Sequence, residues 1–455
     1  MPLLTRSEEP SAASPAGSGD TPAEDTANWR DLPGAVAEAT GAGARGLTQF
    51  FGPFADLTRR FGGRRGTHAE DLTAPTETKP ARLLMVGRFS LYALVVFGSA
   101  TLAWIIGMLR QGRCLQSSPS DSINSFGWMC YTDITVLYQA RGQAAGEVLY
   151  RDIAWEYPVL SGYFSEFAAR LTGLFGQTPS PSLTSEQQLS NTNLYFAITT
   201  ILLFICFLVV VTVQKQWLAN RPWAVLAVAA SPAIMTAALI NWDLFAIALT
   251  SLALLSVTRR QPILAGLWFG LAIAAKFYPV VILGGLLALA LRPIVRAWFK
   301  APDRPAPPGS NAQAESDQDA TEADSANSAA SLMKARYRPL LDYGKLVATA
   351  LGAWVLVNLP VMMMNFDQWK FFYSFNQDRG PDLGSPWYAL NLTGFPTPNA
   401  QAWALGLMII GYLAIALIIV AAPVSPRLGQ VAFLCVALMV SLNTVYSPQY
   451  VLWTL

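Results

Sequence analysis

The residues that could do chemistry in this chain are carboxylates and cations placed beside apolar sequence. Asp133, Arg151, Asp152 and Glu156 gather in one semi-polar segment of a chain that carries few charges. A positioned carboxylate can take a proton from a hydroxyl group while that hydroxyl attacks an electrophilic carbon. Asp133 stands alone between aromatic and β-branched residues, so it is our candidate general base, with a second role in capping a short helix over 134–141. Asp152 and Glu156 are rivals that could equally be solvated loop residues.

Two cations are candidates for holding an anion. Lys276 interrupts the apolar sequence 271–280. An ionisable residue in such a place costs a few kcal/mol unless it is paired or serves an anionic ligand. A lipid phosphate is one natural partner, and snorkelling of the side chain to the membrane surface is the alternative. Arg379 could hold a phosphate through two hydrogen bonds, or it could form a loop salt bridge.

Hydrogen-bonding side chains also stand at the ends of apolar runs. Asn241 and Asp243 precede one such run, where Asp243 could simply cap a helix. Tyr446 and Gln449 follow another run. Their hydroxyl and amide groups suit a polyhydroxylated ligand, but they suit helix capping equally well.

The cysteines and the one histidine limit the chemistry further. Cys206 and Cys435 fall inside apolar runs, whereas Cys114 and Cys130 share one polar segment. If that segment faces an oxidising exterior, Cys114 and Cys130 should form a disulfide; two free thiols are the alternative. His68 lies in the polar N-terminal region, so the apolar part of the chain has no histidine for a metal site or a catalytic triad.

The elements that must position these residues are membrane helices. The chain has 455 residues, of which 53% are hydrophobic and only 13% charged, whereas about 25% is usual in soluble proteins. The charges crowd into 1–88 and 292–342. A net charge of +2 without a contiguous basic block gives no sign of nucleic-acid binding.

A membrane-spanning helix needs roughly 20 apolar residues, and the hydropathy pattern predicts about nine spans. The basic loops indicate that the N-terminus is cytoplasmic, because Lys and Arg favour the cytoplasmic side. This topology puts a long first loop, 110–193, and a second, 365–400, on the outer face with the candidate residues. The expected spans are 89–109, 194–213, 222–240, 244–257, 263–275, 277–291, 346–364, 402–422 and 431–442.

Two segments have the composition of disordered chain. Residues 1–83 and 297–340 are rich in small, polar and acidic residues, so they have little apolar surface to bury. We expect a disordered cytoplasmic tail, a disordered cytoplasmic loop and one transmembrane domain over 84–455. The last apolar run, 450–455, is too short to span, so we expect either a longer parent sequence or the loss of C-terminal helices.

Several of these motifs together resemble glycosyltransferase family 87. They are Tyr131-Thr-Asp133, Tyr157-Pro158, the run 241–249 and Ala275-Lys-Phe-Tyr-Pro279. The family comprises membrane enzymes of the GT-C fold, including actinobacterial mannosyl- and arabinofuranosyltransferases, and the resemblance covers roughly 85–455. It implies an all-α polytopic protein, a GT-C-like helical bundle of about nine transmembrane helices with a long first outer loop.

The resemblance also implies an activity. The donor would be a polyprenyl-phosphate sugar, with Asp133 as general base of an inverting displacement and Lys276 and Arg379 on the donor phosphate. No cofactor and no metal are expected. Mannose is the first expectation and arabinofuranose the second, and the acceptor would be a cell-envelope glycan or glycolipid. Sugar or acceptor binding falls to Glu156, Tyr157, Asn241, Asp243, Tyr446 and Gln449.

The implied location is the cytoplasmic membrane, with membrane lipid around the helices and the active site on the outer face. A transporter or lipid flippase is the main alternative. It would place paired ionisable residues at the bilayer midplane and show internal repeats, neither of which the sequence displays. A non-catalytic scaffold of the cell envelope is a third interpretation.

Overall fold

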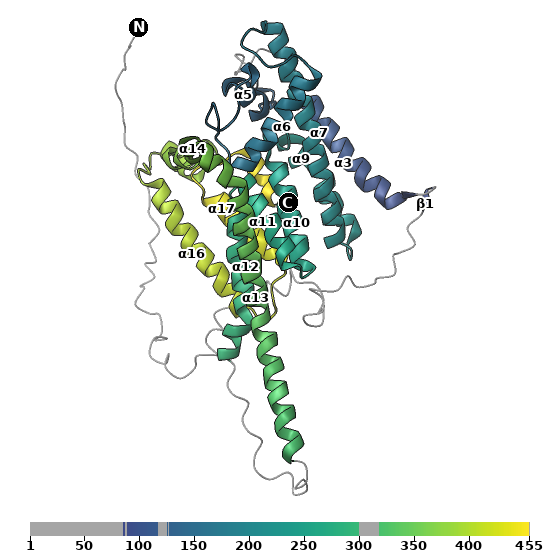
Figure 1. Ribbon diagram of the computed structural model, residues 1–455, viewed down its shortest axis with the longest axis vertical. Helices are drawn as coiled ribbons and strands as arrows, with labels where there is room; N and C mark the ends of the chain where they lie inside the picture. Colours follow the sequence, from purple (N-terminus) through teal and green to yellow (C-terminus); the bar gives the residue numbers. More distant parts are fainter. Residues whose placement is uncertain (1–84, 87–88, 117–124, 126, 300–317, 455) are drawn as a thin grey trace, which may run out of the picture. The chain divides into compact units, whose positions relative to one another are not determined.

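The computed structural model describes residues 85–86, 89–116, 125, 127–299 and 318–454, and most of these residues are helical. The expected tail, 1–83, lies outside the described residues. Two short strands, β1 (Met85–Val86) and β2 (Phe89–Ser90), pair antiparallel before the first long helix. The prediction of an all-α polytopic membrane protein is confirmed (Figure 1).

Five helices in the described part of the chain are long and apolar enough to cross a membrane. They are α3 (Leu91–Gln111), α7 (Ser185–Trp217), α12 (Pro279–Phe299), α13 (Gln318–Met364) and α16 (Ala400–Ala421). Shorter apolar helices occupy Pro222–Ala237, α10 (Asp243–Thr258), α11 (Pro262–Ala275) and α17 (Leu428–Leu442). These helices coincide with the runs expected from the sequence. That each short helix crosses the membrane stays a prediction.

The expected span 222–240 is not one continuous helix. It divides into η5 (Pro222–Val225), α8 (Leu226–Ala229) and α9 (Pro232–Ala237). Pro232 has no N–H to donate, so the preceding helix cannot continue through it. The Ser231 side chain accepts a hydrogen bond from the Ala233 N–H and starts α9 afresh.

The expected loop 297–340 also differs in the structure. Helix α12 continues to Phe299, and α13 begins at Gln318, so residues 318–340 are helical. Residues 300–317 lie outside the described part. The start of α13 is rich in alanine and carries acidic residues near its N-terminus. Alanine has the highest helix propensity, which accounts for a helix in this alanine-rich sequence.

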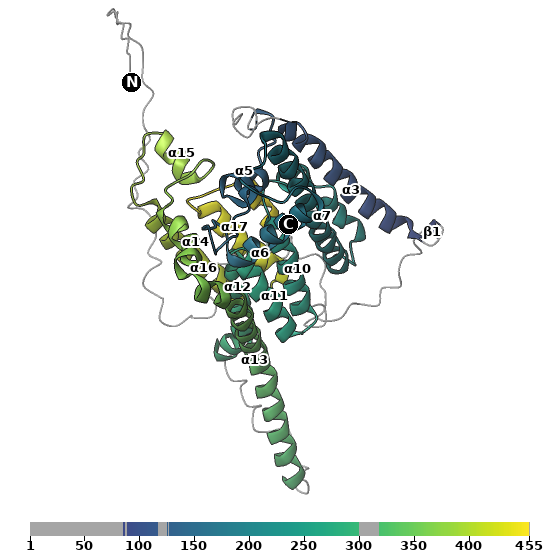
Figure 2. The same ribbon diagram turned by 45° about the horizontal axis from the view of Figure 1, so that its top comes forward.

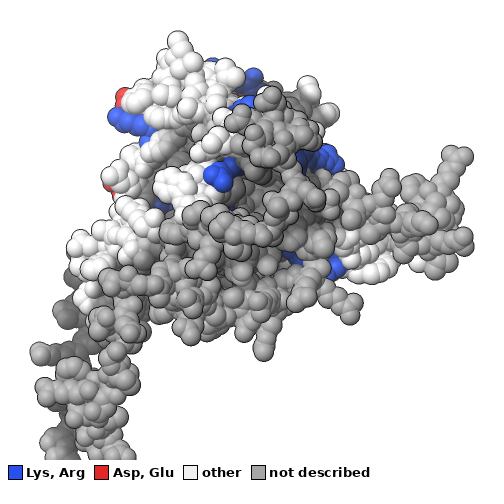
Figure 3. All heavy atoms as spheres, turned by 90° about the horizontal axis from the view of Figure 1, so that it is seen from below, with Lys and Arg blue, Asp and Glu red and all other residues white. Residues whose placement is uncertain are grey.

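Consecutive helices carry the candidate site and the basic residues at opposite ends. Helix α10 runs from Asp243 to the turn at Arg259, α11 returns from that turn to Lys276, and α12 leaves again toward Arg296. Arg259 donates to Gln216 Oε1 at the C-terminal end of α7 over 2.5 Å. Viewed from the lower side of Figure 1, the coloured side chains are mainly Lys and Arg (Figure 3).

Close packing fixes α11 against α13. A Cβ atom at Gly266 would come within 2.3 Å of the Leu346 carbonyl oxygen, and one at Gly270 within 2.3 Å of that of Ala350. Glycine therefore lets the two backbones approach more closely than any other residue would allow. Helix α11 also packs on α10 and α6 (Val159–Phe175). The position of Lys276 at its end is set by these neighbours, and the C-terminal end of the chain lies beside α10 (Figure 2).

Candidate active site

The start of helix α5 (Asp133–Ala140) is attached to the connection between α9 and α10. The Thr132 hydroxyl donates to the Leu239 carbonyl over 2.6 Å, and the Asp133 N–H donates to the Ile240 carbonyl over 2.7 Å. Thr132, not Asp133, caps the helix, because its side-chain oxygen accepts from the Ile134 N–H. The expected capping role of Asp133 is therefore wrong, and its carboxylate is left for other contacts.

Two tyrosines hold the Asp133 carboxylate. Tyr131 donates its hydroxyl to Oδ1 and Tyr157 donates its hydroxyl to Oδ2, each over 2.7 Å. Desolvation by the surrounding protein raises the pKa of the Asp133 carboxyl above its ordinary value, and the two hydrogen bonds and the charge of Lys276 oppose that rise. The residue as a whole is of intermediate exposure. A carboxylate has about four lone-pair positions, so it can accept a further hydrogen bond.

Lys276 and Asp243 form a buried ion pair where α11 ends and α10 begins. The Lys276 Nζ lies 2.7 Å from Asp243 Oδ1, and the two side chains are 14% and 2% exposed. The Asp243 N–H donates to Asn241 Oδ1 over 3.0 Å, so the side chain of Asn241, and not that of Asp243, contacts the backbone at the start of α10. A buried charge persists only with a partner. The ammonium is turned into the protein toward a carboxylate, which argues against snorkelling.

Tyr157 connects Asp133 to Asn241 and Lys276. Its hydroxyl donates to Asp133 and accepts from Asn241 Nδ2 over 3.4 Å. The face of its ring lies 4.5 Å from the Lys276 Nζ, within the range of a cation–π contact. The structure thus brings together five sequence candidates, and we call them the charged cluster: Asp133, Tyr157, Asn241, Asp243 and Lys276.

The C-terminal segment closes one side of the charged cluster. The 3₁₀ helix η6 (Pro448–Thr454) carries Trp453, whose indole N–H donates to Asp243 Oδ2 over 2.8 Å. Gln449, in the same element, is 2% exposed and accepts from the Ser447 hydroxyl over 2.6 Å. Tyr446 precedes η6 and lies near Tyr450, with ring centroids 6.1 Å apart. Sequence reasoning missed Trp453, because its partner Asp243 is 210 positions away along the chain.

The rival carboxylates have other partners. Glu156 forms an ion pair with Arg141. Asp152 accepts from the exposed Arg151 over 2.8 Å and from the Val148 N–H over 2.9 Å. The hydrogen bond from Arg151 is the main cause of the lowered pKa of Asp152. A carboxyl with a lowered pKa is a weaker proton acceptor, so Asp133 is the better candidate for a general base.

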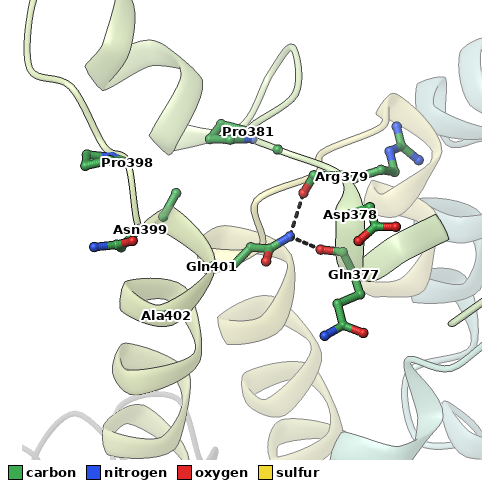
Figure 4. A pocket seen from close by; sticks show the side chains of 10 residues that line it. Gln377, Asp378, Arg379, Pro381, Pro398, Asn399, Gln401 and Ala402 are labelled. Carbon is green, nitrogen blue, oxygen red and sulfur yellow. Dashed lines mark hydrogen bonds between the residues drawn. The ribbon is translucent and has the colours of Figure 1, made fainter. Parts of the chain in front are cut away.

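Arg379 follows α14 (Phe366–Asp378) and is bound within its own loop, since its Nη2 lies 2.5 Å from Asp382 Oδ2. A cavity of about 310 Å³ lies beside this loop. The guanidinium points away from it, while Gln401 donates to the carbonyl oxygens of Gln377 and Arg379 over 2.7 and 2.6 Å (Figure 4). Burial raises the pKa of Tyr131, and the charge of Arg379 opposes that rise, so Arg379 lies within electrostatic reach of the residues around Asp133.

A disulfide joins Cys114 and Cys130, whose Cα atoms lie 5.9 Å apart. Cys114 begins η3 (Cys114–Gln116), just after α3, and Cys130 immediately precedes the Tyr131–Asp133 element. Cys130 is fully buried. The bond therefore connects the end of the first long helix to the segment that presents Asp133.

Residues 188–301 match the family model of glycosyltransferase family 87. The sequence resemblance to family 87 is confirmed over this segment. It spans about a quarter of the chain and contains Asn241, Asp243 and Lys276. No curated protein and no solved structure matches the chain. The match supports a membrane glycosyltransferase in general, whereas Asp133 and Trp453 lie outside the matched segment and are assigned by their geometry alone.

Proposed function

We propose that the protein transfers a sugar from a polyprenyl-phosphate donor to a cell-envelope glycan or glycolipid, with mannose as the first candidate sugar and arabinofuranose as the second. The observation that carries the proposal is the setting of Asp133. Its carboxylate is oriented by two tyrosine hydroxyls, lies within electrostatic reach of the buried Lys276 ammonium, and belongs to a residue of intermediate exposure. Such a group can accept a proton from a substrate hydroxyl.

The proposed reaction is a single displacement. Asp133 takes the proton of an acceptor hydroxyl as its oxygen forms a bond to the anomeric carbon of the donor sugar. The bond between that carbon and the phosphate oxygen breaks, and the polyprenyl phosphate leaves with the electron pair. Attack opposite the leaving group inverts the anomeric configuration.

The negative charge that develops on the leaving phosphate needs a cation nearby. Lys276 is the nearest cation described at the charged cluster, and Arg379 is within electrostatic reach of Tyr131. Both already contact a carboxylate. An ammonium has three donors and a guanidinium five, so each could contact its carboxylate and a phosphate oxygen together. The proposal keeps the expectation that no metal takes part.

A transporter would also need buried charges, but it would need them near the middle of the bilayer. Asp243 is the first residue of α10, and Lys276 directly follows the last residue of α11. The paired charges therefore stand at the ends of two helices, within electrostatic reach of Asp133. This placement favours chemistry at one face over passage through the bundle.

The test uses membranes containing the full chain, incubated with radiolabelled polyprenyl-phosphate mannose and, separately, polyprenyl-phosphate arabinofuranose. We expect label in a glycan or glycolipid with one donor, and none with membranes containing Asp133→Asn. Equal incorporation with wild type and Asp133→Asn would contradict the assignment of the base. No incorporation from any polyprenyl-phosphate sugar, together with uptake of a labelled lipid or solute, would favour transport.

A further inference from the structure

We propose that Trp453 is a positioning residue for this site: its indole N–H holds the Asp243 carboxylate, and thereby fixes the Lys276 ammonium beside Tyr157 and Asp133. This inference rests on the proposed function and deepens it. It adds to the site a C-terminal element, η6, that lies outside the segment matched to family 87.

The two oxygens of Asp243 have separate partners. Oδ1 contacts the Lys276 Nζ at 2.7 Å, and Oδ2 accepts from the Trp453 indole N–H at 2.8 Å. The Asp243 backbone N–H is held by Asn241 Oδ1. A carboxylate bound at both oxygens and at its own backbone cannot rotate without breaking a buried contact. Loss of the indole N–H would leave Oδ2 as a buried acceptor without this donor, which is costly.

Ring stacking fixes the indole in turn. The Trp453 ring lies 4.6 Å from that of Tyr278, with 9° between the ring planes, and 4.0 Å from that of Tyr450, with 26° between the planes. Tyr278 is itself anchored by a hydrogen bond of 3.0 Å to the Thr250 hydroxyl on α10. Tyr278 follows Lys276 by two positions. The stack therefore supports the same short connection that carries the lysine.

Aromatic rings also surround the ammonium. The Lys276 Nζ lies 4.5 Å from the Tyr157 ring centroid, 5.7 Å from that of Trp453 and 5.8 Å from that of Tyr450. The faces of aromatic rings attract a cation within about 6 Å. Asp243 and these rings together define one position for the Lys276 charge, next to the ring whose hydroxyl binds Asp133.

The position of Lys276 bears on the proton affinity of Asp133. The titratable groups around that carboxyl are Tyr131, Tyr157 and Tyr450 together with Asp243 and Lys276. Lys276 lowers the pKa of Asp133, whereas Asp243 raises it. If Lys276 is held less firmly, the pKa of Asp133 rises. The acidic limb of the pH profile of transfer then moves to higher pH, since transfer needs the ionised carboxylate.

The experiment compares Trp453→Phe with Trp387→Phe. Phenylalanine keeps a stacking ring at position 453 but lacks the N–H. Trp387 is a matched control, because it is buried and donates to the Leu442 carbonyl over the same 2.8 Å, away from the charged cluster. We expect Trp453→Phe to lower kcat/KM for transfer about tenfold, because one hydrogen bond to a charged group is lost. We also expect the acidic limb of its pH profile to move to higher pH. Trp387→Phe should leave the limb in place.

Two further measurements separate positioning from folding. In a double-mutant cycle with Asp243→Asn, the double variant should be no less active than Asp243→Asn alone, because Trp453 acts through Asp243. The rate of acetylation of Lys276, followed by mass spectrometry with Lys370 as internal reference, should rise in Trp453→Phe. Any one of three results would overturn the proposal. They are activity losses of the two single variants that multiply in the double variant, a pH profile of Trp453→Phe whose acidic limb has not moved, and an unchanged rate of Lys276 acetylation.

The acetylation measurement needs no substrate, so it separates this inference from the proposed function. If wild type transfers no sugar while Lys276 becomes more reactive in Trp453→Phe, the positioning role stands and the proposed function fails. If wild type transfers sugar and Lys276 reactivity does not change, the proposed function stands and the positioning role fails.

Discussion

At the scale of single residues, Asp133 is the assignment with the sharpest consequence. Asparagine keeps the size of the side chain but cannot take a proton, so Asp133→Asn should lower kcat for transfer by about 10²–10⁴-fold. The measurement is turnover of labelled donor in membranes, normalised to the amount of inserted protein. Asp152→Asn and Glu156→Gln are the matched controls, since their carboxylates contact Arg151 and Arg141. If Asp133→Asn stays active and one of the two control variants is inactive, the carboxylate changed in that control is the base.

Variants of Lys276 separate the effect of its charge on donor use from its effect on stability. Lys276→Ala should weaken donor use more than Lys276→Arg does, because arginine keeps the charge that a phosphate requires. Alanine also leaves Asp243 buried without its cation, which typically costs about 3–5 kcal/mol of stability. The double variant Lys276→Ala with Asp243→Asn removes both charges, so it should recover stability but not donor use.

Donor titrations and thermal unfolding in detergent measure the two effects of Lys276. Lys370→Ala is the matched control, because Lys370 pairs with Asp367 over 2.8 Å at an exposed site. It should change neither donor use nor stability appreciably. Wild-type donor use in both the alanine and the arginine variants of Lys276 would rule out its proposed role.

At the scale of elements, the disulfide joins the end of α3 to the segment that presents Asp133. Alkylation of unreduced protein from intact cells, followed by mass spectrometry, should find Cys114 and Cys130 protected and Cys206 and Cys435 unoxidised. The expectation assumes that this segment faces the oxidising side of the membrane. Recovery of alkylated Cys114 and Cys130 would place the segment in a reducing compartment.

Sequence patterns predicted the positions of the helices better than the contacts between side chains. Apolar runs predicted the helices because membrane spans need uninterrupted apolar length, and Asp133, Asp243 and Lys276 were found because charges are rare in such a chain. Trp453 could not be found, because its partner Asp243 is 210 positions away and the contact depends on tertiary packing. The partner of Arg379, only three positions along the chain, was left open because a loop fixes no local geometry.

At the scale of the whole molecule, the catalytic proposal assigns no role to segment 301–333. Deleting this segment should leave sugar transfer and membrane insertion unchanged, since it removes only the first residue of the apolar part of α13, Met333–Met364. Transfer by isolated membranes and protease accessibility of loop 365–400 measure the two properties. Loss of transfer with normal insertion would show that the segment contributes to activity.

The α10–α11 hairpin also has a consequence for biosynthesis. Asp243 starts the hairpin and Lys276 follows its end, so both charges are synthesised as parts of one short antiparallel unit. On insertion scales, a lone charge at the centre of a membrane helix costs about 2.5–3.5 kcal/mol, which sets an upper bound for these two charges at the helix ends. A hairpin that enters the membrane with these charges already paired would avoid much of that cost. The two helices should therefore leave the translocon together, before Trp453 has been translated.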